Sequence, residues 1–435
     1  MEAHIHASDV TGDNESRLYR KVTLRLVPFL FLCYLAAYLD RVNVGFAKLR
    51  MLEDLSFSES VYGLGAGIFF VGYVLFEVPS NLALHRVGAK WWIARIMITW
   101  GLLSGATAFV TTPTSFYVLR FLLGAAEAGF IPGVLLYLTY WYPSAWRGRI
   151  TSLFLTAIPM TSVLGGPLSG WILEAMSGVG RLAGWQWLFI VEMIPSLIMG
   201  VLTIVYLDNR VADAKWLSAD EKALLARRLA EDENPRSEQG NQAKDALTDL
   251  RVWLLGLIYF CIASGIYIVS FWLPTLIRNT GVANPFDVGL LAVVPYGAAA
   301  IAMVWWNARA DRRRERRWSS ILPCLICASG LAMAAMSSSS TPLTVTALTF
   351  AAAGASTAQA AFLTLPTALL GGTAVAVGIA LVNSLGNIAG LTSTALVGLA
   401  ADVTGSPLAG FYVVGAILSL GSLLILLLPA RSVNR

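Results

Sequence analysis

Apolar residues in this chain fall in long runs separated by short polar segments. Twelve windows are predominantly apolar over about 19 residues, close to the ~20 residues with which an α-helix crosses a bilayer. They lie at residues 24–45, 60–84, 91–111, 115–141, 150–173, 186–207, 252–276, 285–308, 319–338, 343–365, 374–400 and 407–429. The pattern predicts an all-α membrane protein of twelve transmembrane helices in two six-helix halves.

One long polar segment separates the halves. We expect a tail at 1–23, a six-helix bundle at 24–207, a linker at 208–251, a second bundle at 252–429 and a tail at 430–435. In the linker, Ser218 and Glu221 have the spacing of a capping box, ahead of an apolar stripe at Leu224, Leu225 and Leu229. The linker should therefore form a short amphipathic helix, and it is too short for a catalytic domain.

Basic residues are distributed unevenly around the predicted spans. Of the 31 Lys and Arg residues, 25 lie beside the span ends that share a side with both termini, and four lie beside the opposite ends. By the positive-inside rule, both termini and the linker should be cytoplasmic. The net charge of +5 and the pI near 9.0 then reflect membrane orientation rather than nucleic-acid binding.

Composition narrows the class of protein further. The chain is 57% hydrophobic and 13% charged, against roughly 45–50% and about 25% in soluble domains. The four cysteines lie in apolar runs, and Cys324-x-x-Cys327 has no further Cys or His ligand nearby, so we expect neither a metal nor a cofactor. None of the three histidines falls in a span, and no hydrolase motif is present, which argues against an enzyme.

Few polar side chains occur within the spans, and such residues usually face a water-filled cavity and have a function. The ionisable ones all lie in the first half: Asp40, Arg41, Glu77, Arg120, Glu127 and Glu192. The second half has uncharged polar groups instead, chiefly Tyr267, Ser270, Gln359, Asn383 and Asn387.

Helical spacing relates four of the charged residues. Arg120 and Glu127 are seven residues apart, so they share one helix face about 10 Å apart along the axis. Asp40 should lie at a depth similar to that of Arg120, so either an Asp40–Arg120 or an Arg41–Glu127 pair is possible. Protonating a paired acid would free an arginine for another anion, the outline of a proton-coupled anion site.

Structural roles compete with this interpretation. Arg120 and Glu127 could form a purely structural pair, and Glu77 and Glu192 are better placed to brace helix ends. Asn387, between Gly386 and Gly390, could make a packing hydrogen bond between helices.

Four motifs resemble the anion:cation symporter family of the major facilitator superfamily. They begin at Tyr38 (YLDRVN), Arg120 (RFLLGAAEAGFIP), Arg147 (RGR) and Gly184 (GWQWLFIVE), and the resemblance extends over essentially the whole chain. It implies alternating access and symport of an organic anion with protons.

The resemblance also suggests roles for individual residues. It implies that Asp40 and Glu127 carry protons, that Arg41 and Arg120 serve in coupling and in holding a carboxylate, and that Tyr73 and Asn387 line the site. Tyr267, Asn383 and Gln359 are further substrate-binding candidates from the second half.

The loop motif of the superfamily departs from its usual form here. After the second span, Arg86, Gly88 and Lys90 match the motif, but His85 stands where an Asp is usual. The equivalent loop of the second half keeps Asp311 and Arg312, so a gating role is expected for both loops and the first lacks its acidic partner.

Together these features predict a multi-pass bacterial inner-membrane transporter, most simply a monomer, that imports a small organic anion with protons. The aromatic residues of the seventh and tenth spans favour an aromatic or compact dicarboxylate such as phthalate, hydroxyphenylacetate or tartrate. An exchanger or a sugar-acid symporter is an alternative, and a multidrug exporter fits two buried arginines less well.

Overall fold

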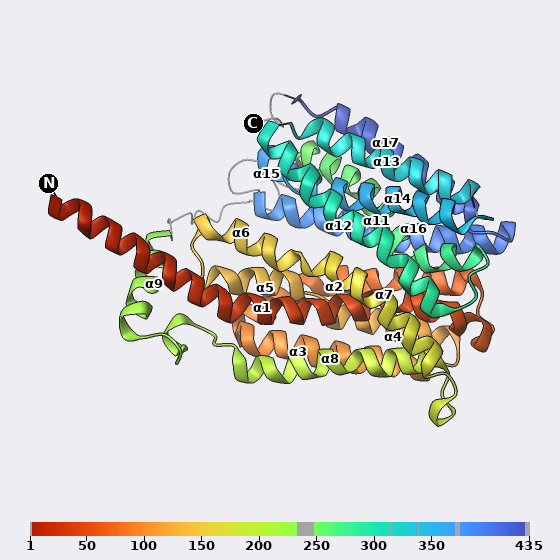
Figure 1. The fold of residues 1–435 in the computed structure, drawn as a ribbon, viewed down its shortest axis with the longest axis horizontal. Helices are drawn as coiled ribbons and strands as arrows, with labels where there is room; N and C mark the ends of the chain where they lie inside the picture. Colours follow the sequence, from red (N-terminus) through yellow and green to blue (C-terminus); the bar gives the residue numbers. More distant parts are fainter. Residues whose placement is uncertain (1, 233–247, 314, 338, 370–374, 431–435) are drawn as a thin grey trace.

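The computed structural model describes residues 2–232, 248–313, 315–337, 339–369 and 375–430, and in these ranges all regular structure is helical. The helices pack side by side in one elongated bundle, with both termini at the same end (Figure 1). We call this end, which also carries α9 (Ala219–Asp232), the linker end, and we call the opposite end the distal end.

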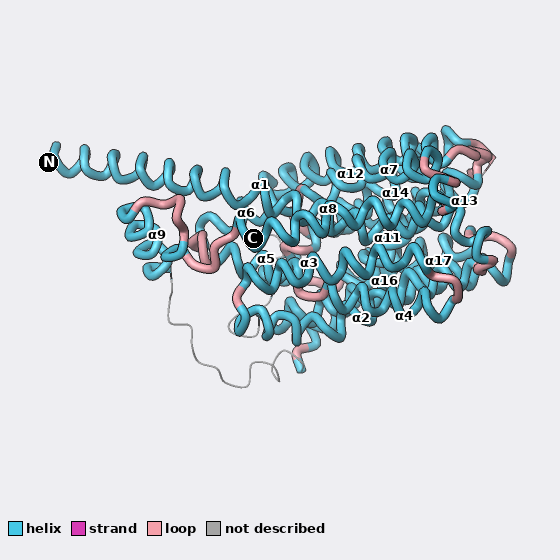
Figure 2. Tube along the Cα trace, turned by 90° about the horizontal axis from the view of Figure 1, so that it is seen from below, coloured by secondary structure: helices cyan, strands magenta, loops and turns pink. Residues whose placement is uncertain are grey.

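The first half corresponds to six membrane crossings. Its helices are α1 (Glu2–Leu55), α2 (Glu59–Val87), α3 (Ala89–Ala106), α4 (Pro113–Glu127), α5 (Phe130–Thr139), α6 (Ser144–Leu155), α7 (Ala157–Ala175) and α8 (Gly184–Tyr206). The fourth crossing is interrupted at Gly129, whose φ of 88° is in the left-handed region that glycine favours. Helix α1 is much longer than its predicted span, 54 residues, and projects beyond the bundle at the linker end (Figures 1 and 2).

The second half repeats the arrangement. Its helices are α11 (Leu250–Asn279), α12 (Pro285–Arg313), α13 (Arg317–Met336), α14 (Thr341–Phe362), the short α15 (Leu365–Leu369), α16 (Val375–Thr404) and α17 (Leu408–Leu426). Eleven helices of the described ranges are long and apolar enough to span a membrane. Helix α14 occupies the place of the predicted tenth span but is not among the eleven, because five threonines and a glutamine lower its hydropathy.

The two halves meet mainly along two helix pairs, α2 with α16 and α7 with α12. Glycines permit these close approaches: a Cβ added to Gly289 of α12 would lie 2.2 Å from the carbonyl oxygen of Gly166 in α7. Similarly, a Cβ on Gly63 of α2 would lie 2.4 Å from the carbonyl oxygen of Thr394 in α16. Backbones this close leave no room for side chains at the contact.

Helix α9 begins with the reciprocal hydrogen bonds of a capping box. The Ser218 hydroxyl accepts from the Glu221 amide at 3.2 Å, and the Glu221 carboxylate accepts from the Ser218 amide at 2.8 Å. Ion pairs then hold α9 to the first half: Lys21–Glu221 at 2.7 Å, Arg228–Glu15 at 2.7 Å and Arg147–Asp232 at 2.9 Å.

Candidate transport site

An ion pair between Arg41 of α1 and Glu127 of α4 lies at the centre of the first half. Only 12% of the Arg41 side chain and 5% of the Glu127 side chain are exposed. The Arg41 guanidinium also lies 5.4 Å from the ring centroids of both Phe69 and Tyr73 in α2. Glu127 is the last residue of α4, so its carboxylate stands where the helix is interrupted. Of the two pairings that the spacing allows, the structure contains this one.

Arg120 lies about two turns from Glu127 on the same face of α4 and has no ionic partner among the described residues. Its side chain is 1% exposed, and its Nε donates to the carbonyl oxygen of Gly65 at 3.3 Å. Both terminal nitrogens, Nη1 and Nη2, are buried without a hydrogen-bond partner among the described residues. The guanidinium lies 5.1 Å from the ring centroid of Phe69, the ring that Arg41 also approaches. A buried cation with two unsatisfied donors is a site where a bound anion would recover a large desolvation cost.

Asp40 does not pair with Arg120, which corrects the other pairing considered from the sequence. Its carboxylate accepts hydrogen bonds from Trp100 Nε1 at 3.0 Å and Ser104 Oγ at 2.8 Å in α3, and from Ser196 Oγ at 2.5 Å in α8. Because neighbouring residues of a helix point about 100° apart, Asp40 and Arg41 cannot both face α4. The carboxyl is buried and satisfied inside the first half.

Aromatic rings extend this cluster to the second half. The Tyr267 ring of α11 lies 4.3 Å from the ring of Phe70 in α2, next to the Phe69 ring shared by the two arginines. The Tyr267 hydroxyl donates to Asn387 Oδ1 of α16 at 2.8 Å. The structure therefore brings Tyr73, Tyr267 and Asn387 together beside the arginines.

Two other predicted residues are placed less centrally. Asn383 Nδ2 donates to Glu77 Oε1 at 3.4 Å, so Glu77 contacts the opposite half instead of only bracing its own helix. Gln359 Nε2 donates to the Tyr259 hydroxyl at 3.3 Å, beside the stacked rings of Tyr259 and Phe362.

The loop residues predicted for gating are partly described. Gly88 links α2 to α3 with a φ of 96°, and the adjacent Lys90 amide donates to Asn209 Oδ1 at 3.1 Å. Arg86 and Arg312 are exposed. The side chains of His85 and Asp311 lie outside the described part of the structure.

A cluster at the distal end was not predicted from the sequence, where Lys48 is one of the four basic residues beside the span ends opposite the termini. Lys48 is 3% exposed, pairs with Glu59 at 2.6 Å, and lies 3.6 Å from the Trp272 ring centroid of α11. Asp402 of α16 accepts from the amides of Glu59 and Ser60 at 3.0 and 2.9 Å, which caps the N-terminus of α2. Lys48 follows Arg41 by seven residues, so the two lie on the same face of one helix. This spacing is the feature of the sequence that could have identified Lys48 as an inward-facing residue.

Further bonds join the halves at the same end. The Tyr62 hydroxyl donates to the Phe271 carbonyl at 2.8 Å, Arg278 bonds the Leu49 carbonyl, and Asn284 Nδ2 donates to Glu174 at 2.9 Å. The structure is therefore a conformation closed at its distal end.

The family model described as Major Facilitator Superfamily matches residues 30–394 and, in a second match, residues 255–435. The chain belongs to the major facilitator superfamily. Being a member, it is a transporter rather than an enzyme; together with its apolar helices and its bacterial relatives, membership makes it a multi-pass protein of the bacterial inner membrane.

Named relatives agree with this membership. The transporter is 54% identical to "Putative metabolite transport protein NicT" of Pseudomonas putida, with 96% of each chain covered. It is 46% identical to a "Putative tartrate transporter" of Agrobacterium vitis, over 97% of this chain and 94% of the relative. It is 40% identical to a "Quinolone resistance transporter" of Acinetobacter baumannii, with 96% of each covered.

Solved structures share the fold. A D-xylose–proton symporter superposes with a TM-score of 0.72 at 16% identity, covering 95% of this chain and 99% of that one. A bacterial homologue of the lysosomal transporter Spinster, solved in an inward-facing and occupied conformation, gives 0.69 at 16% identity, covering 92% and 96%.

Proposed function

We propose that this transporter imports a small organic carboxylate together with protons by alternating access. The observation that carries the proposal is the buried guanidinium of Arg120 beside the Arg41–Glu127 pair, whose two terminal nitrogens have no hydrogen-bond partner in the part of the chain that the structure describes. A carboxylate can accept both Nη donors of one arginine in bidentate fashion. A substrate anion bound there would satisfy Arg120.

Proton coupling follows from the pairing of Arg41. While Glu127 is ionised, it neutralises Arg41; once Glu127 is protonated, Arg41 becomes available to a second anionic group. Asp40 is the second proposed proton carrier, because its buried carboxylate has hydroxyl and indole donors but no ion-pair partner among the described residues. Binding of the anion and binding of the proton would thereby favour one another.

A compact dicarboxylate is the substrate class that we propose. Two arginines close to one aromatic ring suit an anion with two carboxylates, and two relatives at 46% and 45% identity carry the name tartrate transporter. Tyr73, Tyr267 and Asn387 would contribute the phenol and amide groups. Drug export is the second candidate, supported by the relative named for quinolone resistance.

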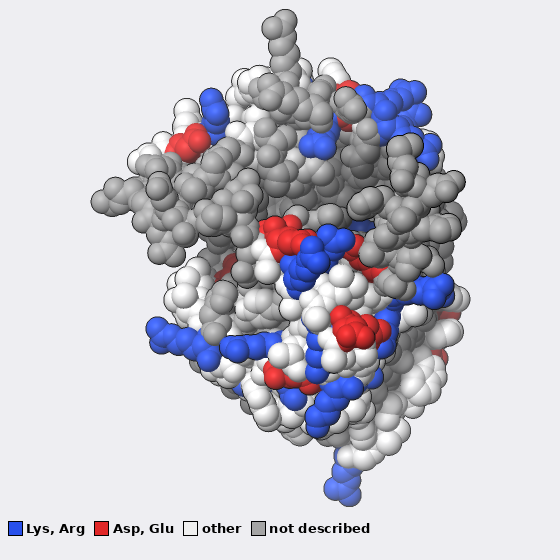
Figure 3. Space-filling model, turned by 90° about the vertical axis from the view of Figure 1, so that its left-hand side faces the viewer, with Lys and Arg blue, Asp and Glu red and all other residues white. Residues whose placement is uncertain are grey.

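We also propose that the linker end faces the cytoplasm. The predicted cytoplasmic flanks hold 25 of 31 basic residues, and Figure 3 views this end of the molecule, with Lys and Arg side chains spread over it. With the distal end closed, the structure then corresponds to a conformation closed toward the periplasm.

Uptake into proteoliposomes tests the proposal. Purified protein should accumulate labelled tartrate against its gradient when the outside is acidic, with phthalate, 4-hydroxyphenylacetate, galactonate and a quinolone as competitors. Asp40→Asn and Glu127→Gln should abolish proton-driven accumulation, and Arg120→Lys should impair transport, because a compact ammonium cannot form two parallel bonds.

The exposed acid Glu53 provides a matched control, since Glu53→Gln should leave uptake unchanged. Unchanged accumulation in both Asp40→Asn and Glu127→Gln would refute the coupling role. If Arg120→Lys took up substrate as well as the wild type, Arg120 would have a structural role and not a role in binding the carboxylate.

A further inference from the structure

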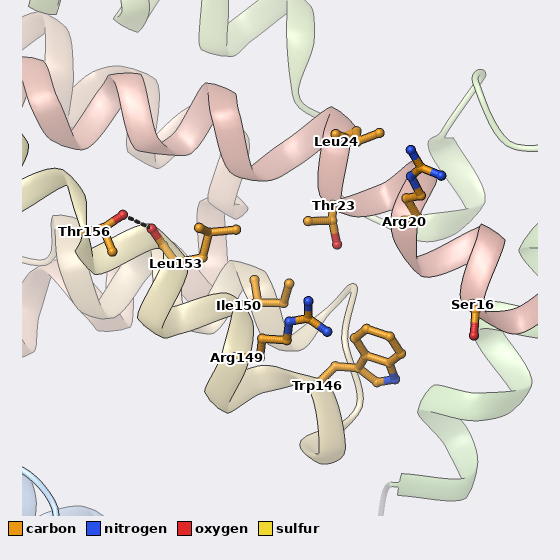
Figure 4. Close-up of a pocket in the computed structure, with 9 residues that line it drawn as sticks. All are labelled: Ser16, Arg20, Thr23, Leu24, Trp146, Arg149, Ile150, Leu153 and Thr156. Atoms are coloured by element: carbon orange, nitrogen blue, oxygen red, sulfur yellow. Dashed lines mark hydrogen bonds between the residues drawn. The ribbon is translucent and has the colours of Figure 1, made fainter. Parts of the chain in front are cut away.

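A cavity of about 680 Å³ lies between α1 and α6 near the linker end, outside the site described above. Arg20, Thr23 and Leu24 of α1 line one side, and Trp146, Arg149 and Leu153 of α6 line the other (Figure 4). Its volume is within the roughly 300–1,000 Å³ of sites that bind small molecules.

The lining changes from cationic to apolar along one direction. Both helices run away from the linker end, so Leu24 lies one turn deeper than Arg20, and Leu153 one turn deeper than Arg149, about 6 Å in each case. These leucines are 64% and 47% exposed, on the helix faces that carry the arginines. The cavity is therefore basic at its outer mouth and apolar on its membrane side.

Neither arginine of this cavity is neutralised by a described acidic side chain. Arg20 and Arg149 are both exposed, and no hydrogen bond or ion pair to either guanidinium is present among the described residues. Nearby arginines at the same end differ, since Arg147 pairs with Asp232 and Arg228 pairs with Glu15. Two guanidiniums on facing helices, both without a partner among the described side chains, form a site for an anion with several acceptor oxygens.

The ring of Trp146 indicates that the cavity lies at the level of the lipid headgroups. It stacks on Tyr19 with ring centroids 4.7 Å apart, so the indole is held at the wall of the cavity. Tryptophan concentrates at the level of lipid headgroups in membrane proteins. The Thr23 hydroxyl, which accepts from the Tyr142 hydroxyl at 3.2 Å, adds a polar group at the same level.

We propose that this cavity binds the phosphate headgroup of an anionic phospholipid from the leaflet at the linker end. Arg20 and Arg149 contact the phosphate oxygens, and an acyl chain runs past Leu24 and Leu153. The apolar side selects a lipid over a soluble anion, because exposed leucines recover free energy only against a hydrocarbon. Bound lipid would bridge α1 to α6, the short helix that Thr156 separates from α7. The proposal rests on the membrane location and is independent of the transported substrate.

Lipid titration of the purified, delipidated full-length protein tests this inference. Phosphatidylglycerol added to the detergent solution should raise the melting temperature and appear as bound lipid in native mass spectrometry, since a ligand of the folded state stabilises it. Phosphatidylcholine and inorganic phosphate should do neither. The double variant Arg20→Gln/Arg149→Gln should bind phosphatidylglycerol about 30-fold more weakly, the factor for losing two surface cations at about 1 kcal/mol each.

A charge-matched control separates the cavity from general attraction to the basic end. Arg210 and Arg313 are exposed at that end, so Arg210→Gln/Arg313→Gln removes the same charge and should retain binding. Leu153→Asp leaves both arginines in place and should also weaken phosphatidylglycerol binding. It tests the cavity independently in case the double variant of Arg20 and Arg149 does not fold. If both double variants bound phosphatidylglycerol equally well, the proposal would be overturned. If inorganic phosphate raised the melting temperature as much as phosphatidylglycerol does, the ligand would be a soluble anion and not a lipid.

Discussion

Gly398→Ala tests how tightly the distal end is closed. Gly398 of α16 packs on the first turn of α2, where an added Cβ would lie 2.4 Å from the carbonyl oxygen of Glu59. Ordinary contact begins at 3.4 Å, so the backbones must separate by about 1 Å to admit one methyl group. Alanine favours a helix over glycine, so any penalty arises from the contact and not from helix propensity.

The size of the effect follows from this overlap. Adding a methyl group to a close-packed contact costs about 1–3 kcal/mol. Under the proposed alternating access, the cost is incurred only while α2 and α16 are closed at this end, so the equilibrium should shift toward the distally open conformation by about 5- to 150-fold. The same argument predicts a similar shift for Gly63→Ala, which faces the Thr394 carbonyl oxygen at 2.4 Å.

Pulsed spin-label distances measure this shift directly. Glu53 near the end of α1 and Val403 near the end of α16 are both exposed, so cysteines there can be labelled while the four native cysteines are buried. The distance distribution in Gly398→Ala should gain a longer component. Gly297→Ala is the matched control, because its Cβ would have no atom within 4 Å. An unchanged distribution in Gly398→Ala, or the same change in Gly297→Ala, would refute the steric argument.

Three further outcomes are expected. Asp402→Ala should lengthen the same spin-label distance, because removing a helix-capping acceptor costs about 0.5–2 kcal/mol in the closed conformation only. An unaltered distance would show that the cap on α2 does not stabilise the closed conformation. Glu192 accepts from Ser169 at 2.7 Å and pairs with no cation among the described residues, so Glu192→Gln should keep the thermal stability and Glu192→Leu should lower it, as unfolding in detergent would show. The hydrogen bond from Lys21 lowers the pKa of Glu221, so its contribution to docking α9 is present at neutral pH and is lost as the pH falls below the ordinary glutamate pKa of about 4.3. Hydrogen exchange of residues 219–232 should rise there, and Glu221→Gln should weaken that dependence, the remainder coming from the Arg228–Glu15 and Arg147–Asp232 pairs.

The sequence alone determined the helices and the residues worth testing. Bilayer thickness fixes the length of an apolar run, and charge at membrane depth is costly, so the spans and the group Asp40, Arg41, Arg120 and Glu127 can be identified without coordinates. The capping-box spacing likewise marks the start of α9, because that interaction is local in the chain.

Only the tertiary structure decided which of these groups meet. The rotation of α1 sends Arg41 to Glu127 and Asp40 to Trp100 and Ser104, and helix spacing by itself allowed either arrangement. Likewise, Asp402 caps α2 across more than 340 residues of chain, a contact that no local pattern encodes. Periodicity fixes which residues share a helix face, whereas the partner of that face depends on how the many similar apolar helices pack against one another.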